Sequence, residues 1–167
     1  MVPPDTERLR FRRMADSDLD AMAALLGDPA VMTYYPAPKT RDQAQAWIGW
    51  NLRNYAEHGF GLWIIESGDG VFVGDCGLTW QPVNGRTELE VGYHVRAAAQ
   101  GQGLATEAAA ACQAYARSVR LAHTLVAIIH PDNWASQRVA KKIGLRLIEE
   151  DPGVDGQGMR LVYSTPV

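Results

Sequence analysis

Strict alternation of apolar and polar residues predicts a strand over residues 88–95. One face of this strand would carry Leu89, Val91, Tyr93 and Val95, and the other Glu88, Glu90, Gly92 and His94. After a turn at residues 100–103, apolar residues recur at helical spacing, at Leu104, Ala108, Ala111, Cys112, Tyr115 and Val119. The centre of the chain therefore predicts a strand, a glycine-containing turn and a helix in direct succession.

Turn and cap residues divide the rest of the chain into further elements. Before the central unit, the pattern predicts a short strand over 8–13, helices over 16–26 and 40–58, a proline-containing loop between those helices, and a hairpin of strands 62–66 and 71–78. Asn84-Gly85 predicts the reversal into the central strand. After the central helix, it predicts an apolar strand over 124–129, a helix over 134–142, and strands near 146–149 and 159–163.

The turn Gln100-Gly101-Gln102-Gly103 has the character of an anion site. A helix that starts after a glycine turn leaves several N–H groups unpaired at the positive end of its dipole. Such a helix start binds a phosphate or pyrophosphate without a lysine. Glycine lets the backbone approach the anion closely, because it has no Cβ. A tight connection without a ligand is the alternative interpretation.

Composition restricts the class of protein. A chain of 167 residues that is 47% hydrophobic predicts one globular domain over residues 1–167. The net charge of −3 argues against a basic surface that binds nucleic acid. A mildly acidic surface suits an amine substrate, which is positively charged. No signal-peptide core and no membrane-spanning run is apparent, and Cys76 and Cys112 are expected as buried free thiols. We therefore expect a cytoplasmic protein without a membrane partner.

Aromatic residues concentrate between the first two helices and along the second. Six of them fall within 27 residues, namely Tyr34, Tyr35, Trp47, Trp50, Tyr55 and Phe60. They either pack the helix onto the core or line an acceptor pocket, because aromatic loop segments often border ligand clefts. Tyr34, Tyr35 and Trp50 are the candidates for the pocket.

Three ordered motifs, ELEVGYHV, QGQGLATEA and HPDNWASQRVAKKIGLRL, resemble the GNAT superfamily of acetyl-CoA-dependent N-acetyltransferases. The segments TERLRFR, DPAV and VGDCGL also resemble its branch of bacterial ribosomal-protein N-terminal acetyltransferases. The resemblance implies an α/β fold of the GNAT type. In this fold a mixed, mostly antiparallel central sheet of six to seven strands is flanked by about four helices. It also implies direct transfer of an acetyl group to a primary amine, most simply a peptide N-terminus.

The resemblance also assigns acetyl-CoA contacts. Pantetheine would pair with the backbone of Tyr93, His94 and Val95, and Asn133 would contact the same arm. The pyrophosphate would lie on the amides of the turn and first helical turn, at Gln100, Gly101, Gln102, Gly103, Leu104, Ala105 and Thr106. The family's arginine or glutamine before the first glycine is Ala98 here, and Arg96 is a candidate for the missing charge.

Glu90 is the candidate base, because it lies in Glu-Val-Gly-Tyr and faces away from the apolar side of its strand. Glu88 shares that face and is the second candidate for the base as well as a pocket residue. A base working through water suits an α-amine, whose pKa is about 8, better than a lysine amine of about 10.4. A solvent-facing strand carboxylate is the alternative interpretation of Glu90.

The candidate acid is Ser136, which resembles the serine that this branch offers to the leaving thiolate. The family's usual tyrosine on this helix is replaced by Ala140. Alternatively, Asn133 is a plain N-cap and Ser136 an ordinary first-turn residue.

Other chemistries lack their motifs. The chain contains no Walker loop, no third Rossmann glycine at Thr106 and no metal-ligand spacing among its four histidines, so we expect no metal. A small-molecule amine acceptor, such as a polyamine or aminoglycoside, remains open, as do a homodimer and a non-catalytic acetyl-CoA-binding relative.

Overall fold

A seven-stranded sheet organises the chain, which a computed structural model describes at residues 1–153, 156 and 158–167. The elements in order are β1 (Leu9–Arg12), η1 (Asp16–Asp18), α1 (Leu19–Leu26), α2 (Arg41–His58), β2 (Leu62–Ser67), β3 (Phe72–Val83), β4 (Arg86–Val95), η2 (Ala97–Ala99), α3 (Leu104–Ser118), β5 (Thr124–Ile129), α4 (Trp134–Lys142), β6 (Arg146–Asp151) and β7 (Arg160–Pro166). The strand order is β1-β2-β3-β4-β5-β7-β6, and only β4 and β5 pair in parallel. This is the expected mixed, mostly antiparallel α/β sheet with four α-helices.

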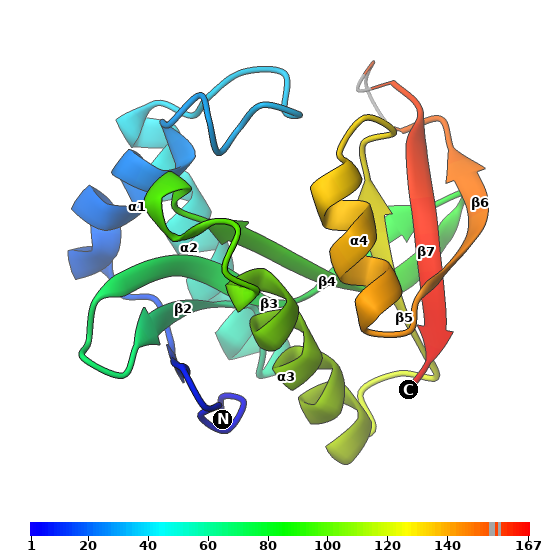
Figure 1. Cartoon of the computed structure of the whole chain (residues 1–167), viewed down its shortest axis with the longest axis horizontal. Helices are drawn as coiled ribbons and strands as arrows, with labels where there is room; N and C mark the ends of the chain where they lie inside the picture. The colour runs from blue at the N-terminus through cyan, green and yellow to red at the C-terminus, as the bar shows by residue number, and fades with distance from the viewer. Residues whose placement is uncertain (154–155, 157) are drawn as a thin grey trace.

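The helices cover the two faces of the sheet (Figure 1). On one face, α2 places the Trp47 indole 3.1 Å from the Asp75 carboxylate of β3. On the other face, α3 places Cys112 Sγ 3.6 Å from Cys76 Sγ of the same strand. Both cysteines are free and buried, as the sequence predicts. Because side chains alternate along a strand, Asp75 and Cys76 label the two faces.

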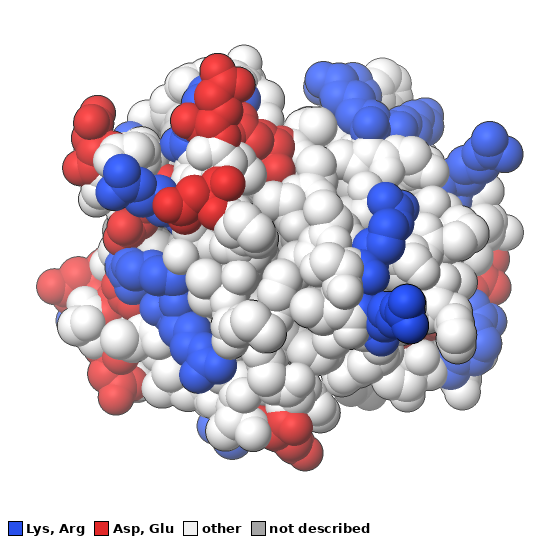
Figure 2. Space-filling view, turned by 90° about the horizontal axis from the view of Figure 1, so that it is seen from below, with Lys and Arg blue, Asp and Glu red and all other residues white. Residues whose placement is uncertain are grey.

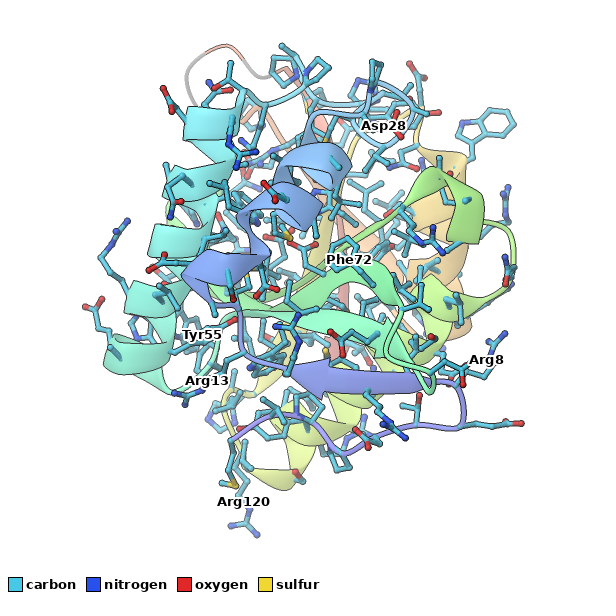
Figure 3. The ribbon with its side chains drawn as sticks, turned by 90° about the vertical axis from the view of Figure 1, so that its left-hand side faces the viewer. Arg8, Arg13, Asp28, Tyr55, Phe72 and Arg120 are labelled. Carbon is cyan, nitrogen blue, oxygen red and sulfur yellow. The ribbon has the colours of Figure 1, made fainter. Side chains whose placement is uncertain are left out.

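The side chain of Tyr55 anchors α2 to β2 and to the segment that follows β1. Tyr55 Oη accepts from the Met14 amide at 3.1 Å and donates to the Leu62 carbonyl. The Arg13 guanidinium lies 5.2 Å from the centre of the same ring, and Figure 3 shows the two side chains together at the end of α2. This anchoring holds the C-terminal end of α2 against the sheet.

Most element predictions are confirmed, with three corrections at their ends. β3 continues to Val83 rather than ending at 78, because it pairs with β4 along its whole length. Val119 lies beyond α3 and is 38% exposed, while Ala116 takes the buried position. Met159 precedes β7 and is exposed. These boundaries depend on how far the neighbouring strand or helix extends, and the local sequence pattern does not contain that information.

β4 and β5 diverge immediately after they meet. Their parallel register contains only two pairs, Leu89 with Leu125 and Glu90 with Val126. β4 nevertheless stays paired with β3 as far as Val95, so the divergence opens on one side only. In an antiparallel pair, alternate backbone groups point away from the partner. The final residues of β4 therefore direct backbone groups into the opening.

Candidate active site

Glu90 lies where β4 and β5 separate, as the last residue of β4 that pairs with β5. Its side chain is on the α2 face of the sheet and is half-buried. Burial raises the pKa of Glu90 to about 7, and the opposing charge of Arg160 limits the rise. A carboxylate with this pKa is divided between its two forms near neutral pH, as a general base should be.

Glu88, the second candidate, is held in a different way. Its carboxylate accepts from Arg86 Nε at 3.0 Å and from Thr124 Oγ1 at 3.1 Å. Arg86 also pairs with Glu149, so Glu88 belongs to a surface charge network. Those contacts favour a structural role and leave Glu90 as the better placed base.

Tyr93 brings a phenol to Ser136, a contact that sequence reasoning missed. Tyr93 Oη lies 2.6 Å from Ser136 Oγ and 3.3 Å from the Ser136 carbonyl. Burial raises the pKa of Tyr93, so the phenol keeps its proton at neutral pH. The family motif locates its tyrosine at position 140 of α4, where this chain has a buried alanine. The alternation of β4 is the signal that could have revealed Tyr93, because it directs this side chain towards α4.

Backbone amides are available in the turn before α3. Gly101 and Gly103 have φ of 75° and 78°, a region that favours glycine, and Gly103 is the N-cap of α3. Within the described part of the chain, the amides of residues 102–106 have no hydrogen-bond acceptor. The Gln100 amide differs, because it donates to the Ala97 carbonyl at 3.2 Å. The free donors therefore start after Gln100 and coincide with the start of the helix dipole.

Arg8 is the cationic side chain that the structure places against this turn. Its Nη1 donates to the Gln102 carbonyl at 2.7 Å, and its Nε pairs with Glu107 of α3 at 2.6 Å. Figure 3 shows Arg8 at the start of β1. Arg96, the candidate from sequence, is exposed at the start of η2. The geometry thus favours Arg8 as the positive charge next to an anion in the turn.

The remaining acetyl-CoA candidates border the same opening. Tyr93, His94 and Val95 form the unpaired side of β4, although the Val95 carbonyl already accepts from Gln100 Nε2 at 2.9 Å. Asn133 is the N-cap of α4, and its Oδ1 accepts from the Ser136 amide at 3.1 Å. Leu104 is buried at the start of α3, while Ala105 and Thr106 are half-buried. Free amides, an adjacent cation and an open strand edge fit a pyrophosphate with an extended arm.

Two tyrosines from the loop between α1 and α2 cover the α2 face of the opening. The Tyr35 ring lies 5.4 Å from the His94 ring, and the Tyr34 ring lies 5.3 Å from the ring of His130, which follows β5. Trp50 lies apart from them and lines an open hollow of about 410 Å³ with Lys39, Gln43, Ala46, Trp47 and Gln81. The structure therefore brings Tyr34 and Tyr35 to the site and puts Trp50 in a neighbouring hollow.

Surface and metal features add few constraints. Among the described residues, no group of three or more His, Cys, Asp or Glu side chains could hold a metal ion. None of the described helices combines the length and apolarity needed to cross a membrane. Figure 2 shows acidic and basic side chains interspersed on the left of one face, with a broad uncharged region beside them.

Known proteins share both this sequence and this fold. The family model for the GNAT acetyltransferase domain matches residues 8–146. YkkB of Bacillus subtilis is 42% identical over 142 residues, covering 84% of this chain and 83% of YkkB. An acetyltransferase from Agrobacterium tumefaciens has a TM-score of 0.84 and 29% identity, covering 98% of this chain and 93% of its own. RimL, a ribosomal L7/L12 α-N-protein acetyltransferase solved with coenzyme A, has a TM-score of 0.81 and 17% identity. The match covers 100% of this chain and 98% of the RimL chain.

The fold and the site define an acetyltransferase. The chain belongs to the GNAT acetyltransferase family and is an N-acetyltransferase, which transfers an acetyl group from acetyl-CoA to an amine. The likeness to RimL, at 17% identity, concerns the fold alone.

Proposed function

We propose that this enzyme acetylates the α-amine of a peptide or protein N-terminus. The observation that carries the proposal is Glu90, whose pKa of about 7 suits an acceptor of only slightly higher pKa. Moving a proton to such a base costs roughly 1 kcal/mol from an α-amine of pKa about 8, and roughly 5 kcal/mol from a lysine-like amine of about 10.4. The site therefore favours α-amines.

The proposed chemistry uses side chains on both faces of the sheet. Glu90, on the α2 face, receives the proton of the amine through a water molecule as the nitrogen attacks the thioester carbonyl. Tyr93 and Ser136, on the α4 face, hydrogen-bond the leaving sulfur, and the Tyr93 phenol supplies its proton as the C–S bond breaks. Hydrogen bonds to developing charge are among the strongest contributions to catalysis.

The cofactor side of the proposal rests on the turn before α3. The amides of residues 102–106 and Arg8 would hold the pyrophosphate, and the opening beside Tyr93–Val95 would receive the pantetheine arm. Asn133 has an amide group left for that arm, since only its Oδ1 is engaged in the cap.

A small-molecule amine is the second candidate acceptor. The hollow beside Trp47 and Trp50 favours it, because it is of ligand size and mainly apolar. Its rim carries Lys39, whose ammonium lies 5.2 Å from the Trp47 ring centre and would disfavour polycations such as polyamines.

Thiol release from acetyl-CoA over an acceptor panel tests the proposal. The panel has four members. The peptide Ser-Ala-Ala offers an α-amine, a longer peptide with a blocked N-terminus and an added lysine offers only the lysine side-chain amine, and spermidine and benzylamine are the small-molecule amines. We expect the highest kcat/KM for Ser-Ala-Ala, with a rate that rises with pH through about 7 as Glu90 loses its proton. Glu90→Gln should lower kcat/KM by about 100-fold or more and remove that rise. A higher kcat/KM for the blocked lysine peptide or for spermidine would refute the α-amine assignment.

A further inference from the structure

The loop of residues 31–39, between α1 and α2, contacts residues near the diverging ends of both β4 and β5. Tyr35 reaches His94 near the end of β4, and Tyr34 reaches His130 after β5. Glu90 lies on the same face of β4 as His94, at the point where the two strands separate. An amine that approaches Glu90 from the α2 side therefore passes the Tyr35 hydroxyl.

Asp75 determines where the ring proton of His94 lies. It is fully buried, and its Oδ1 lies 2.7 Å from His94 Nδ1 and 3.1 Å from the His94 amide. Its Oδ2 accepts from Trp47 Nε1 at 3.1 Å. An ionised carboxylate can only accept hydrogen bonds, so Nδ1 must carry a proton. In the neutral imidazole, Nε2 is then left as an acceptor.

The direction of the next hydrogen bond follows from that tautomer. Tyr35 Oη lies 2.8 Å from His94 Nε2 and must donate its only hydrogen to it. Two lone pairs then remain on Oη, and no hydrogen. Tyr35 is 45% exposed as a residue, but desolvation of its hydroxyl and the charges of Glu90 and Asp75 raise its pKa. The hydroxyl therefore stays protonated and keeps this orientation. Towards the site, Tyr35 Oη is therefore a hydrogen-bond acceptor only.

We propose that Tyr35 Oη, oriented by Asp75 through His94, accepts a hydrogen bond from the acceptor's amino group next to Glu90. This inference rests on the proposed amine-acetylating function and specifies the amine subsite. Two neighbouring groups that only accept, Tyr35 Oη and the Glu90 carboxylate, match a primary ammonium with its three donors. A hydroxyl has one donor and can satisfy only one of them. Tyr35 thus contributes to the choice of amine over alcohol.

Tyr35→Phe tests the proposal, with Tyr115→Phe as the matched control. Tyr115 packs on Trp63 in the α3 core, so its variant measures any general effect of losing a phenol oxygen. The substrate is the panel amine that the unmodified enzyme turns over fastest, and the assays are run at pH 8. We expect Tyr35→Phe to lower kcat/KM for the amine about 10- to 100-fold, with the Kd for acetyl-CoA unchanged.

An alcohol isostere separates recognition of the amine from general disorder of the loop. For Ser-Ala-Ala the isostere has a hydroxyl in place of the α-amine, and for benzylamine it is benzyl alcohol. Tyr35→Phe should raise the KM of the amine substrate and leave inhibition by the alcohol isostere within about twofold. Equal weakening of both, or an unchanged kcat/KM for the amine, would overturn the proposal.

A double-mutant cycle tests the role of Asp75. Asp75→Asn releases the tautomer of His94, so it should lower the amine kcat/KM in the wild-type background and cause no further loss in Tyr35→Phe. Additive losses would overturn the orientation by Asp75. Should Asp75→Asn fail to fold, the isostere comparison decides alone. If spermidine or benzylamine is the fastest acceptor, the peptide assignment fails while Tyr35 is tested on that amine. If the enzyme turns over none of the amines, both the proposed amine-acetylating function and the role of Tyr35 are overturned.

Discussion

At the residue scale, burial gives Glu90 its chemistry and also destabilises the fold. Its pKa is raised to about 7 from an ordinary value of about 4.5, so the folded protein favours the protonated form. The stabilisation from this protonated form is complete below the unfolded pKa and is lost as pH rises through about 7. The carboxylate form, which is the one proposed to act as the base, therefore belongs to the less stable state of the folded protein.

Glu90→Gln should accordingly stabilise the enzyme in a pH-dependent way. We expect little difference in the free energy of unfolding at pH 4.5, and a gain of about 1–3 kcal/mol at pH 8. Thermal unfolding at both pH values measures it. Glu88→Gln is the control, since Glu88 is paired with Arg86, and it should give no gain at pH 8. An equal melting temperature for Glu90→Gln and the wild type at pH 8 would contradict the raised pKa.

Tyr93→Phe should lower kcat about 10- to 100-fold with little change in KM for either substrate, because the proposed role of the phenol is to protonate the leaving sulfur. Ser136→Ala should have a smaller effect, since Tyr93 keeps its proton without the serine. Single-turnover assays with acetyl-CoA measure the transfer step directly. An unchanged rate constant in Tyr93→Phe would exclude the phenol as the acid.

The residue scale also shows what the sequence could reveal about the site. Alternation puts Glu90 and Glu88 on one face, and the Glu-Val-Gly-Tyr motif ranked Glu90 first. The contacts of Glu88 with Arg86 and Thr124, which separate the two further, became visible only in the structure. Ser136 was recognised from its motif, but Tyr93 was assigned a backbone role. Their 2.6 Å contact joins residues 43 positions apart, so no local pattern contains it.

At the element scale, the start of α3 combines a left-handed backbone with unpaired amides. Gly103→Ala forces a Cβ into φ of 78°, where a non-glycine residue costs roughly 1–2 kcal/mol. We expect a lower melting temperature and a weaker Kd for acetyl-CoA, because relief of the strain turns the amides away from the anion. Isothermal titration measures the Kd. Gly68→Ala, in the β2–β3 hairpin with open space around it, should change neither quantity. A normal Kd in Gly103→Ala would contradict the assignment of this turn.

The ends of a helix could be predicted from the sequence where capping residues mark them. α2 begins after Thr40, whose side chain accepts from the Gln43 amide at 3.2 Å, and ends at Gly59 in a left-handed conformation. Both capping signals depend on residues within one turn of the helix end, so they can be recognised in the sequence. The end of β3 was not, because β4 determines how far that strand continues.

At the scale of the whole molecule, coenzyme A should join parts that the sheet leaves apart. The turn before α3, the end of β4 and the start of α4 surround one opening, and β4 contacts β5 through only two residue pairs. A ligand that binds all three should stabilise the folded state in proportion to its affinity. At 100 times its Kd the gain is about 2.7 kcal/mol.

We therefore expect coenzyme A to raise the melting temperature by about 5–10 °C at that concentration. Differential scanning fluorimetry measures the shift, and hydrogen exchange should slow in residues 91–95 and in α4. Adenosine lacks both the pyrophosphate and the pantetheine arm, so it should give a much smaller shift. An equal shift with adenosine would contradict binding along the β4–β5 opening.

The sequence by itself determined the local features, namely the alternation of β4, the caps of α2, the hairpin turns and the glycine turn before α3. Each depends on side-chain period or backbone φ within a few residues, so the amino acids specify it without a partner. The tertiary structure alone decided which carboxylate is buried, which phenol contacts Ser136, and that Asp75, His94 and Tyr35 form one chain of hydrogen bonds. Burial, charge and hydrogen-bond direction depend on neighbours that only folding brings together.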